Sequence, residues 1–166
     1  MKPTTRSLTR AALIAAIYLL LTILFQPISF GAVQFRISEA LTLLPVLTVD
    51  AVPGLLVGCL LANLLGGGIW YDVALGSVAT LLAAISTYKL RNRPLIAAFM
   101  PVLFNGLIVG PVVYMAYVRA PGAPISWPLM FSSMGTVAFG ELVVCYVLGL
   151  LMLKALQRLP KQYLGA

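Results

Sequence analysis

The stretch "AALIAAIYLLLTILF", residues 11–25, decides the fold class. It belongs to a run of 25 residues, 11–35, that carries no charged side chain. A helix needs roughly 20 consecutive apolar residues to cross the hydrocarbon of a membrane. Similar uncharged runs cover residues 51–71 and 94–118. The sequence therefore predicts membrane-spanning helices.

Composition points the same way, because 61% of the 166 residues are hydrophobic and only 9% are charged. A soluble domain of this size has no core large enough for so much apolar surface. We expect an all-α integral membrane protein, a single domain over residues 1–166 that forms a compact bundle of six transmembrane helices. The second helix is short and contains Pro45, so we expect it to be kinked or partly inserted. The predicted spans are 8–25, 37–49, 52–65, 71–89, 94–117 and 129–153.

The net charge of +7 is distributed as a topology signal. Basic residues lie at the ends of the predicted spans, and cytoplasmic loops carry the excess of Lys and Arg. With both termini cytoplasmic, the outer side holds only Arg36 and Arg119. We therefore expect a multi-pass plasma-membrane protein in the lipid bilayer, with a retained first helix and no nucleic-acid partner. The basic residues of the inner flanks are Lys2, Arg6, Arg10, Lys89, Arg91, Arg93, Lys154, Arg158 and Lys161.

The residues that usually carry catalysis or bind metals are scarce. Histidine is absent, and Cys59 and Cys145 stand alone in apolar stretches. This pattern does not match zinc, redox or Ser/His chemistry, so we expect no enzyme activity, metal or cofactor. An intramembrane enzyme that uses paired acids stays open as an alternative, as does a small oligomeric channel.

Ionisable side chains inside spans are costly and are functional candidates by default. The predicted topology places most polar residues in the outer half of the bundle, near aromatic rings. This predicts an outward-opening pocket for a small, planar, polar molecule. Its three carboxylates outnumber one arginine, so a cation or a molecule rich in N–H donors fits better than an anion. The candidate residues are Arg36, Glu39, Asn63, Trp70, Tyr71, Asp72, Asn105 and Glu141.

Several of these residues also have interpretations that need no ligand. Arg36 and Glu39 lie one helical turn apart and neutralise each other in one interpretation. Asp72 is placed to cap a helix. Asn63 and Asn105 suit interhelical hydrogen bonds, and the aromatic residues suit an interfacial belt. Sequence alone leaves these alternatives open.

Small residues four positions apart let helices approach closely in lipid. The glycine pairs are expected to pack inside the bundle. Two consecutive alanine rows on the first helix form a flat strip that suits either internal packing or another protein. The pairs are Gly54/Gly58, Gly106/Gly110, Ala11/Ala15 and Ala12/Ala16.

Four segments together resemble a known family. They are "QFRISEALTLLP" (34–45), "PGLLVGCLLANLLGG" (53–67), "DVALGSVATLLAA" (72–84) and "GELVV" (140–144). In this order they resemble the queuosine-precursor (QueT) family of S-components, the substrate-binding membrane subunits of energy-coupling-factor (ECF) importers.

The resemblance implies capture of a 7-deazaguanine such as preQ1 from outside the cell. It also implies a transmembrane coupling subunit and two cytoplasmic ATPase subunits as partners. A vitamin or another small nutrient is the alternative substrate. The residues expected to contact the coupling subunit are Ala11, Ala12, Ala15 and Ala16.

The same resemblance suggests roles for the polar residues. Glu141 or Glu39 would bind the guanine-like edge, and Asp72 would meet the ammonium group. Arg36 would orient Glu39 or bind the ring carbonyl, and residues 27–35 would form a lid. The amides that complete the hydrogen bonds would be Gln34, Asn63 and Asn105.

Overall fold

The computed structural model describes residues 4–31 and 34–158, and every regular element in these two ranges is helical. Three helices among the described residues are long and apolar enough to cross a membrane, Thr5–Leu24, Pro94–Val118 and Trp127–Leu156. Shorter apolar helices cover Ile37–Val46 and Ala51–Leu65. The predicted all-helical fold with several candidate spans is confirmed.

The helices of the structure, in chain order, fall within or close to the predicted spans. Here η1 is a 3₁₀ helix, and η2 to η5 are π-helical. The elements are α1 (Thr5–Leu24), α2 (Gln26–Ser29), η1 (Ile37–Val46), α3 (Ala51–Leu65), η2 (Asp72–Gly76), α4 (Ser77–Lys89), α5 (Pro94–Ala97), α6 (Phe99–Phe104), η3 (Asn105–Val109), α7 (Gly110–Val113), η4 (Tyr114–Val118), α8 (Trp127–Val143), η5 (Val144–Gly149) and α9 (Leu150–Leu156).

Local sequence signals explain where several of these helices begin and end. The Thr4 side chain accepts a hydrogen bond from the backbone N–H of Ser7 at 3.2 Å and so caps α1. Pro94 opens α5, where the absent N–H costs nothing. After α3, Gly67 adopts φ +85°, a left-handed conformation that glycine tolerates best. This turn reverses the chain toward η2.

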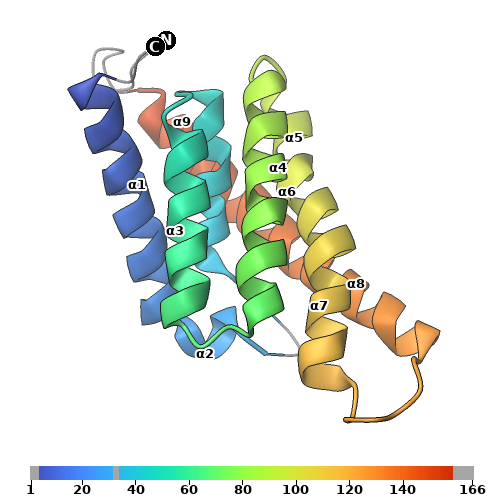
Figure 1. Ribbon diagram of the computed structural model, residues 1–166. Helices are drawn as coiled ribbons and strands as arrows, with labels where there is room; N and C mark the ends of the chain where they lie inside the picture. Colours follow the sequence, from blue (N-terminus) through green and yellow to red (C-terminus); the bar gives the residue numbers. More distant parts are fainter. Residues whose placement is uncertain (1–3, 32–33, 159–166) are drawn as a thin grey trace.

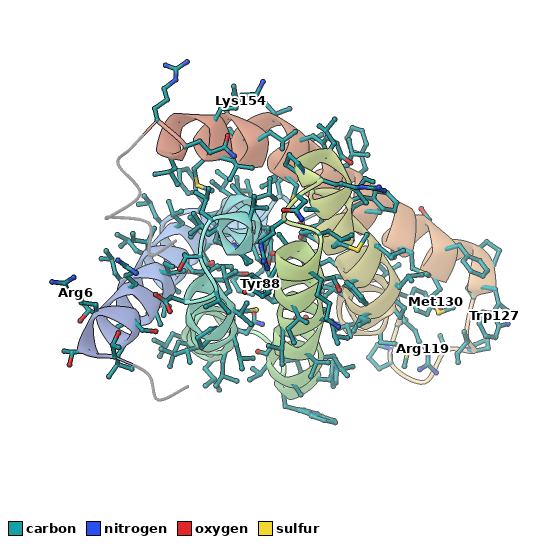
Figure 2. The ribbon with its side chains drawn as sticks, turned by 90° about the horizontal axis from the view of Figure 1, so that it is seen from above. Arg6, Tyr88, Arg119, Trp127, Met130 and Lys154 are labelled. Atoms are coloured by element: carbon teal, nitrogen blue, oxygen red, sulfur yellow. The ribbon has the colours of Figure 1, made fainter. Side chains whose placement is uncertain are left out.

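The helices form a bundle with two distinct ends. Figure 1 shows α1, α3 and α4 side by side, with the chain from α8 to α9 passing obliquely behind them. The start of α1, the end of α4 and α9 lie at one end, whereas α2 and the α7–α8 connection lie at the other. Seen from above in Figure 2, the oblique segment runs from Trp127 at one edge toward Lys154.

The contact between α1 and α3 depends on glycine. A Cβ atom on Gly54 would lie 2.7 Å from the carbonyl oxygen of Ala11. One on Gly58 would lie 3.0 Å from the Cα of Ala15. The Gly54/Gly58 pair therefore packs inside the bundle, as predicted, because only glycine allows backbones to come this close.

The second helix differs from an ordinary crossing. η1 has ten residues, which at about 2.0 Å each span about 20 Å, less than the roughly 30 Å of hydrocarbon. Most of its residues are buried inside the bundle, among them Leu43 and Pro45. The second helix is therefore short and irregular, as its length and Pro45 indicated, and it is a 3₁₀ helix.

An acidic residue joins α1 to the turn that precedes α3. Ser7 Oγ donates to Asp50 Oδ1 at 2.5 Å, and Arg10 Nη1 lies 3.4 Å from Asp50 Oδ2. The Asp50 side chain is largely buried, and that of Arg10 is about a quarter exposed. This cluster closes the end of the bundle that holds the start of α1.

We expect Asp50→Asn to lower the free energy of unfolding by about 1 kcal/mol, because a partly exposed ion pair contributes little. Thermal unfolding in detergent measures this change. Ligand affinity should be unaffected. A loss of binding would mean that this end of the bundle takes part in substrate recognition.

Candidate functional site

Seven of the predicted binding residues are buried, with exposed fractions between 0% and 8%. They come from separate parts of the chain that the fold assembles into one bundle. Two precede η1, and the others lie on η1, α3, η2, η3 and α8. They are Gln34, Arg36, Glu39, Asn63, Asp72, Asn105 and Glu141, and we call them the polar cluster.

Glu39 is fully buried on η1. Its Oε1 accepts a hydrogen bond from the hydroxyl of Tyr18 on α1. Arg36 Nη1 lies 3.9 Å from the same oxygen. The other carboxyl oxygen, Oε2, has no hydrogen-bond partner. One oxygen of this carboxyl group is thus held by the protein, and the other has no hydrogen-bond partner.

Arg36 provides the positive charge of the cluster. Its guanidinium lies 5.5 Å from the centre of the Phe30 ring and interacts electrostatically with Glu39, Glu141 and Asp72. Arg36 and Glu39 do form an ion pair, as one interpretation of the sequence held. However, Nε and Nη2 of the guanidinium have no hydrogen-bond partner. The ion pair with Glu39 therefore involves only Nη1 and leaves two guanidinium nitrogens without a hydrogen-bond partner.

Asn63 and Asp72 meet across the glycine turn. Asn63 Nδ2 donates to the backbone carbonyl of Asp72 at 3.1 Å, so this amide does join two helices. Asp72 Oδ2 accepts from the hydroxyl of Tyr117 at 3.5 Å, and Oδ1 has no partner. Because neither oxygen bonds to a helix N–H, the carboxyl does not act as the predicted cap.

Glu141 of α8 and Glu39 of η1 both lie near Cys145. The two carboxyl groups interact electrostatically, and the Asn105 amide neighbours both. Cys145 Sγ lies 3.8 Å from Glu141 Oε2. No hydrogen bond of ordinary geometry engages either polar atom of the Asn105 amide. Two neighbouring carboxyl groups and an unsatisfied amide are therefore buried together.

Within residues 4–31 and 34–158, eight buried side-chain polar atoms lack a hydrogen-bond partner, and all belong to the polar cluster. Native proteins satisfy the large majority of such atoms, and each unsatisfied one costs about 1–3 kcal/mol. Their concentration in one place is typical of a ligand site. The atoms are Gln34 Nε2, Arg36 Nε and Nη2, Glu39 Oε2, Asn63 Oδ1, Asp72 Oδ1, and Asn105 Nδ2 and Oδ1.

The two aromatic residues predicted to bind substrate are more exposed than the residues of the polar cluster. Trp70 is 76% exposed, and Tyr71 is half-buried. Their rings contact each other edge to face, with centroids 5.1 Å apart. This arrangement fits the alternative of an interfacial belt, in which aromatic rings sit at the membrane surface.

Sequence reasoning missed Tyr18, which contacts Glu39 directly. A usable signal was present, because Tyr18 follows Ala11 and Ala15 at helical spacing on the face that packs against α3. A hydroxyl on that face must find a partner inside the bundle.

The segment between α1 and η1 is anchored at both ends. Gln26 Nε2 donates to the carbonyl of Gly66 at 3.0 Å, and the Phe30 ring packs against the same glycine. At the other end, the carbonyl of Gln34 packs against Gly140 of α8. Residues 32 and 33 of the predicted lid lie outside the described residues. The remainder bridges α3 and α8 beside the polar cluster.

The alanine rows of α1 have different surroundings. Ala15 is buried and Ala11 half-buried against α3, whereas Ala12 and Ala16 are exposed. Beside Ala16 lies an apolar groove of about 580 Å³, lined by Ala16, Leu19, Leu20, Ile23 and Leu65. The free part of the predicted contact strip is therefore the Ala12/Ala16 row.

Among the described residues, no group of three or more His, Cys, Asp or Glu side chains is arranged to hold a metal ion. The carboxyl groups of the polar cluster instead neighbour Arg36 and amide side chains. Such a set of groups suits an organic ligand with several hydrogen-bonding atoms.

Comparison with known proteins identifies the family. The family described as "QueT transporter" matches residues 8–158. The "Queuosine precursor transporter QueT" of Lactococcus lactis subsp. cremoris (strain MG1363) is 32% identical over 83 residues, which are 49% of this chain and 48% of that protein. The chain thus aligns with about half the length of this curated relative. No solved structure matches. Because the family match covers nearly the whole sequence, the chain belongs to the QueT transporter family, whose members are membrane transporters and not enzymes.

Proposed function

We propose that this chain is the substrate-binding membrane subunit, or S-component, of an ATP-driven ECF importer. The polar cluster would capture a 7-deazaguanine queuosine precursor such as preQ1 from outside the cell. The observation that carries this proposal is the set of eight buried, unpaired polar atoms on six residues of the polar cluster. The Lactococcus relative is named as a queuosine precursor transporter, which supports the substrate class.

The chemistry of the unpaired atoms suits this ligand. Unpaired acceptors lie on Glu39, Asn63 and Asp72, and unpaired donors lie on Gln34 and Arg36. The pyrimidine ring of preQ1 presents a ring N–H and an exocyclic amine, which match carboxylate acceptors, and a carbonyl, which matches the donors. Its methylammonium group adds a positive charge to a cluster in which carboxyl groups outnumber arginine.

Roles for individual residues follow from these matches. Glu39, with Glu141 close by, would bind the N–H edge of the ring, and Asp72 would meet the ammonium group. Arg36 and Gln34 would donate to the carbonyl. Asn63 and Asn105 would complete the hydrogen bonds. Trp70 is not part of the proposed site, because its side chain is largely exposed whereas the polar cluster is buried.

We further propose six crossings with both termini cytoplasmic, in the plasma membrane. Arg6 and Arg10 of α1 and Lys154 of α9 belong to the end of the bundle that also holds the end of α4. This distribution supports a cytoplasmic location of that end. Lys2 and Lys161, counted in the sequence, lie outside the described residues.

Partners of the S-component would be a transmembrane coupling subunit and two cytoplasmic ATPases. The exposed Ala12/Ala16 row and the groove beside it offer an apolar surface for the coupling subunit. The sequence has no G-x-x-x-x-G-K-[ST] motif, so energy would come from the ATPase partners.

The direct test is to identify the small molecule that copurifies with the protein by mass spectrometry. Titration calorimetry with preQ1 then measures affinity, with riboflavin and thiamine as control ligands. The proposal expects a 7-deazapurine in the first experiment and saturable preQ1 binding in the second. A vitamin recovered reproducibly in its place would overturn the substrate assignment.

Glu141→Gln tests the second acid of the cluster. We expect about tenfold weaker preQ1 binding, because a carboxamide is a poorer acceptor for the N–H groups of the ring. The protein should remain folded, since Glu141 forms no ion pair within 4 Å among the described residues. Calorimetry on the purified variant provides the measurement. Unchanged affinity would remove Glu141 from the site.

A further inference from the structure

We infer that Tyr18 is a positioning residue that holds Glu39 for recognition of the amine-bearing edge of the base and thereby sets ligand selectivity. This inference rests on the proposed function of the polar cluster. Tyr18 contributes no unpaired polar atom of its own, so its role is exerted through Glu39.

The hydrogen bond from Tyr18 makes the two oxygens of Glu39 different. The hydroxyl donates to Oε1, while Oε2 stays without a partner. A glutamate side chain has several rotatable bonds, and its terminal torsion is broad. Fixing Oε1 therefore decides the direction in which Oε2 accepts a hydrogen bond from a ligand.

Arg36 does not replace this function. Its Nη1 lies 3.9 Å from Oε1, beyond hydrogen-bond distance. At this separation the guanidinium attracts the carboxyl group without setting its rotation. The hydroxyl of Tyr18 supplies the directional contact.

The position of Tyr18 is itself determined by the backbone. Its side chain is fully buried, and its Cβ would lie 2.9 Å from a Cβ on Gly58. One turn later on α1, Thr22 Oγ1 lies 2.7 Å from Oγ of Ser38, a residue of η1. Two contacts, one to α3 and one to η1, thus hold α1 at a fixed distance from Glu39.

A positioned carboxylate discriminates between ligands more sharply than a mobile one. A site built to accept a hydrogen bond from an amine rejects an analogue that lacks it, because the acceptor is then left unpaired. If Glu39 rotates freely, it turns toward other partners, and this penalty decreases. Loss of the Tyr18 hydroxyl should therefore weaken the binding of ligands that carry the amine more than the binding of ligands that lack it.

Two ligands that differ only in the exocyclic amine isolate this effect. Calorimetry would compare 7-deazaguanine with 7-deazahypoxanthine in the unaltered protein, in Tyr18→Phe and in Thr22→Val. Tyr18→Phe removes one hydroxyl and keeps both the ring and the Cβ that packs beside Gly58. Thr22→Val removes a hydrogen bond between α1 and η1 that does not involve Glu39.

We expect Tyr18→Phe to weaken 7-deazaguanine binding by about tenfold and 7-deazahypoxanthine binding by less than about twofold. Thr22→Val should leave the ratio of the two affinities unchanged. In a Glu39→Gln background, Tyr18→Phe should have little additional effect, because residues that act together are not additive. Tyr18→Met, which fills similar space without a hydroxyl, provides a second test if the phenylalanine variant is unstable.

The outcomes separate this inference from the proposed function. If Tyr18→Phe lowers the affinity for both ligands equally, or for neither, the positioning role is overturned while the proposed site stands. Failure of the unaltered protein to bind 7-deazaguanine or preQ1 would overturn the proposed substrate and this inference together.

Discussion

Glu39→Gln is expected to weaken preQ1 binding by about 100-fold, or about 2.8 kcal/mol, the largest effect of any substitution in the polar cluster. The amide would leave Arg36 without the partner that lies 3.9 Å away. It would also present an N–H donor or an amide oxygen where Oε2 now offers a carboxyl oxygen without a partner. Hydrogen bonds to charged groups contribute about 1.5–3 kcal/mol, which agrees with this magnitude.

Calorimetry with purified protein measures the change, and thermal unfolding in detergent confirms that the variant is folded. Asp50→Asn is the matched control, since it makes the same chemical change in the cluster with Ser7 and Arg10. Binding by Glu39→Gln within twofold of the unaltered protein would show that Glu39 does not contact the ligand.

Gly58→Val is expected to lower the free energy of unfolding by about 3 kcal/mol, the upper part of the range for overpacked cores. A Cβ at this position would lie 2.9 Å from the Cβ of Tyr18 and 3.0 Å from the Cα of Ala15. Because Ala15 Cα is a backbone atom, α1 must move away as a whole. Helix association in lipid depends on this close approach.

Gly135→Val of α8 is the control, because a Cβ there meets no atom within 4 Å. It should unfold at nearly the same temperature as the unaltered protein. The two variants are compared by thermal unfolding and by yield in the same detergent. Equal stability of the two variants would contradict the close contact between α1 and α3.

Much of the fold was predictable because long uncharged runs have few alternatives. The first run predicted a span over 8–25, and the structure has a helix over Thr5–Leu24. The glycines after residue 65 marked the end of α3. Pro45 indicated an irregular second helix, but no local signal distinguishes a kinked α-helix from a 3₁₀ helix.

The candidate site was harder to derive, because depth in the membrane does not determine which way a side chain points. Trp70 and Asp72 are two residues apart, yet one is exposed and the other buried. Tyr18 was missed because a tyrosine in an apolar helix usually serves packing or the interface. Contacts such as that between Tyr18 and Glu39 depend on helix rotation, which apolar sequence leaves unspecified.

Two π-helical segments open on residues of the polar cluster, η2 on Asp72 and η3 on Asn105. A wide turn of this kind accommodates one residue more than an α-helical turn and is common at functional sites. Gain or loss of a single codon there would change the side chain that projects inward while the flanking turns keep their packing. The set of inward-facing side chains in this scaffold can therefore change through one-residue insertions and deletions as well as through point substitutions.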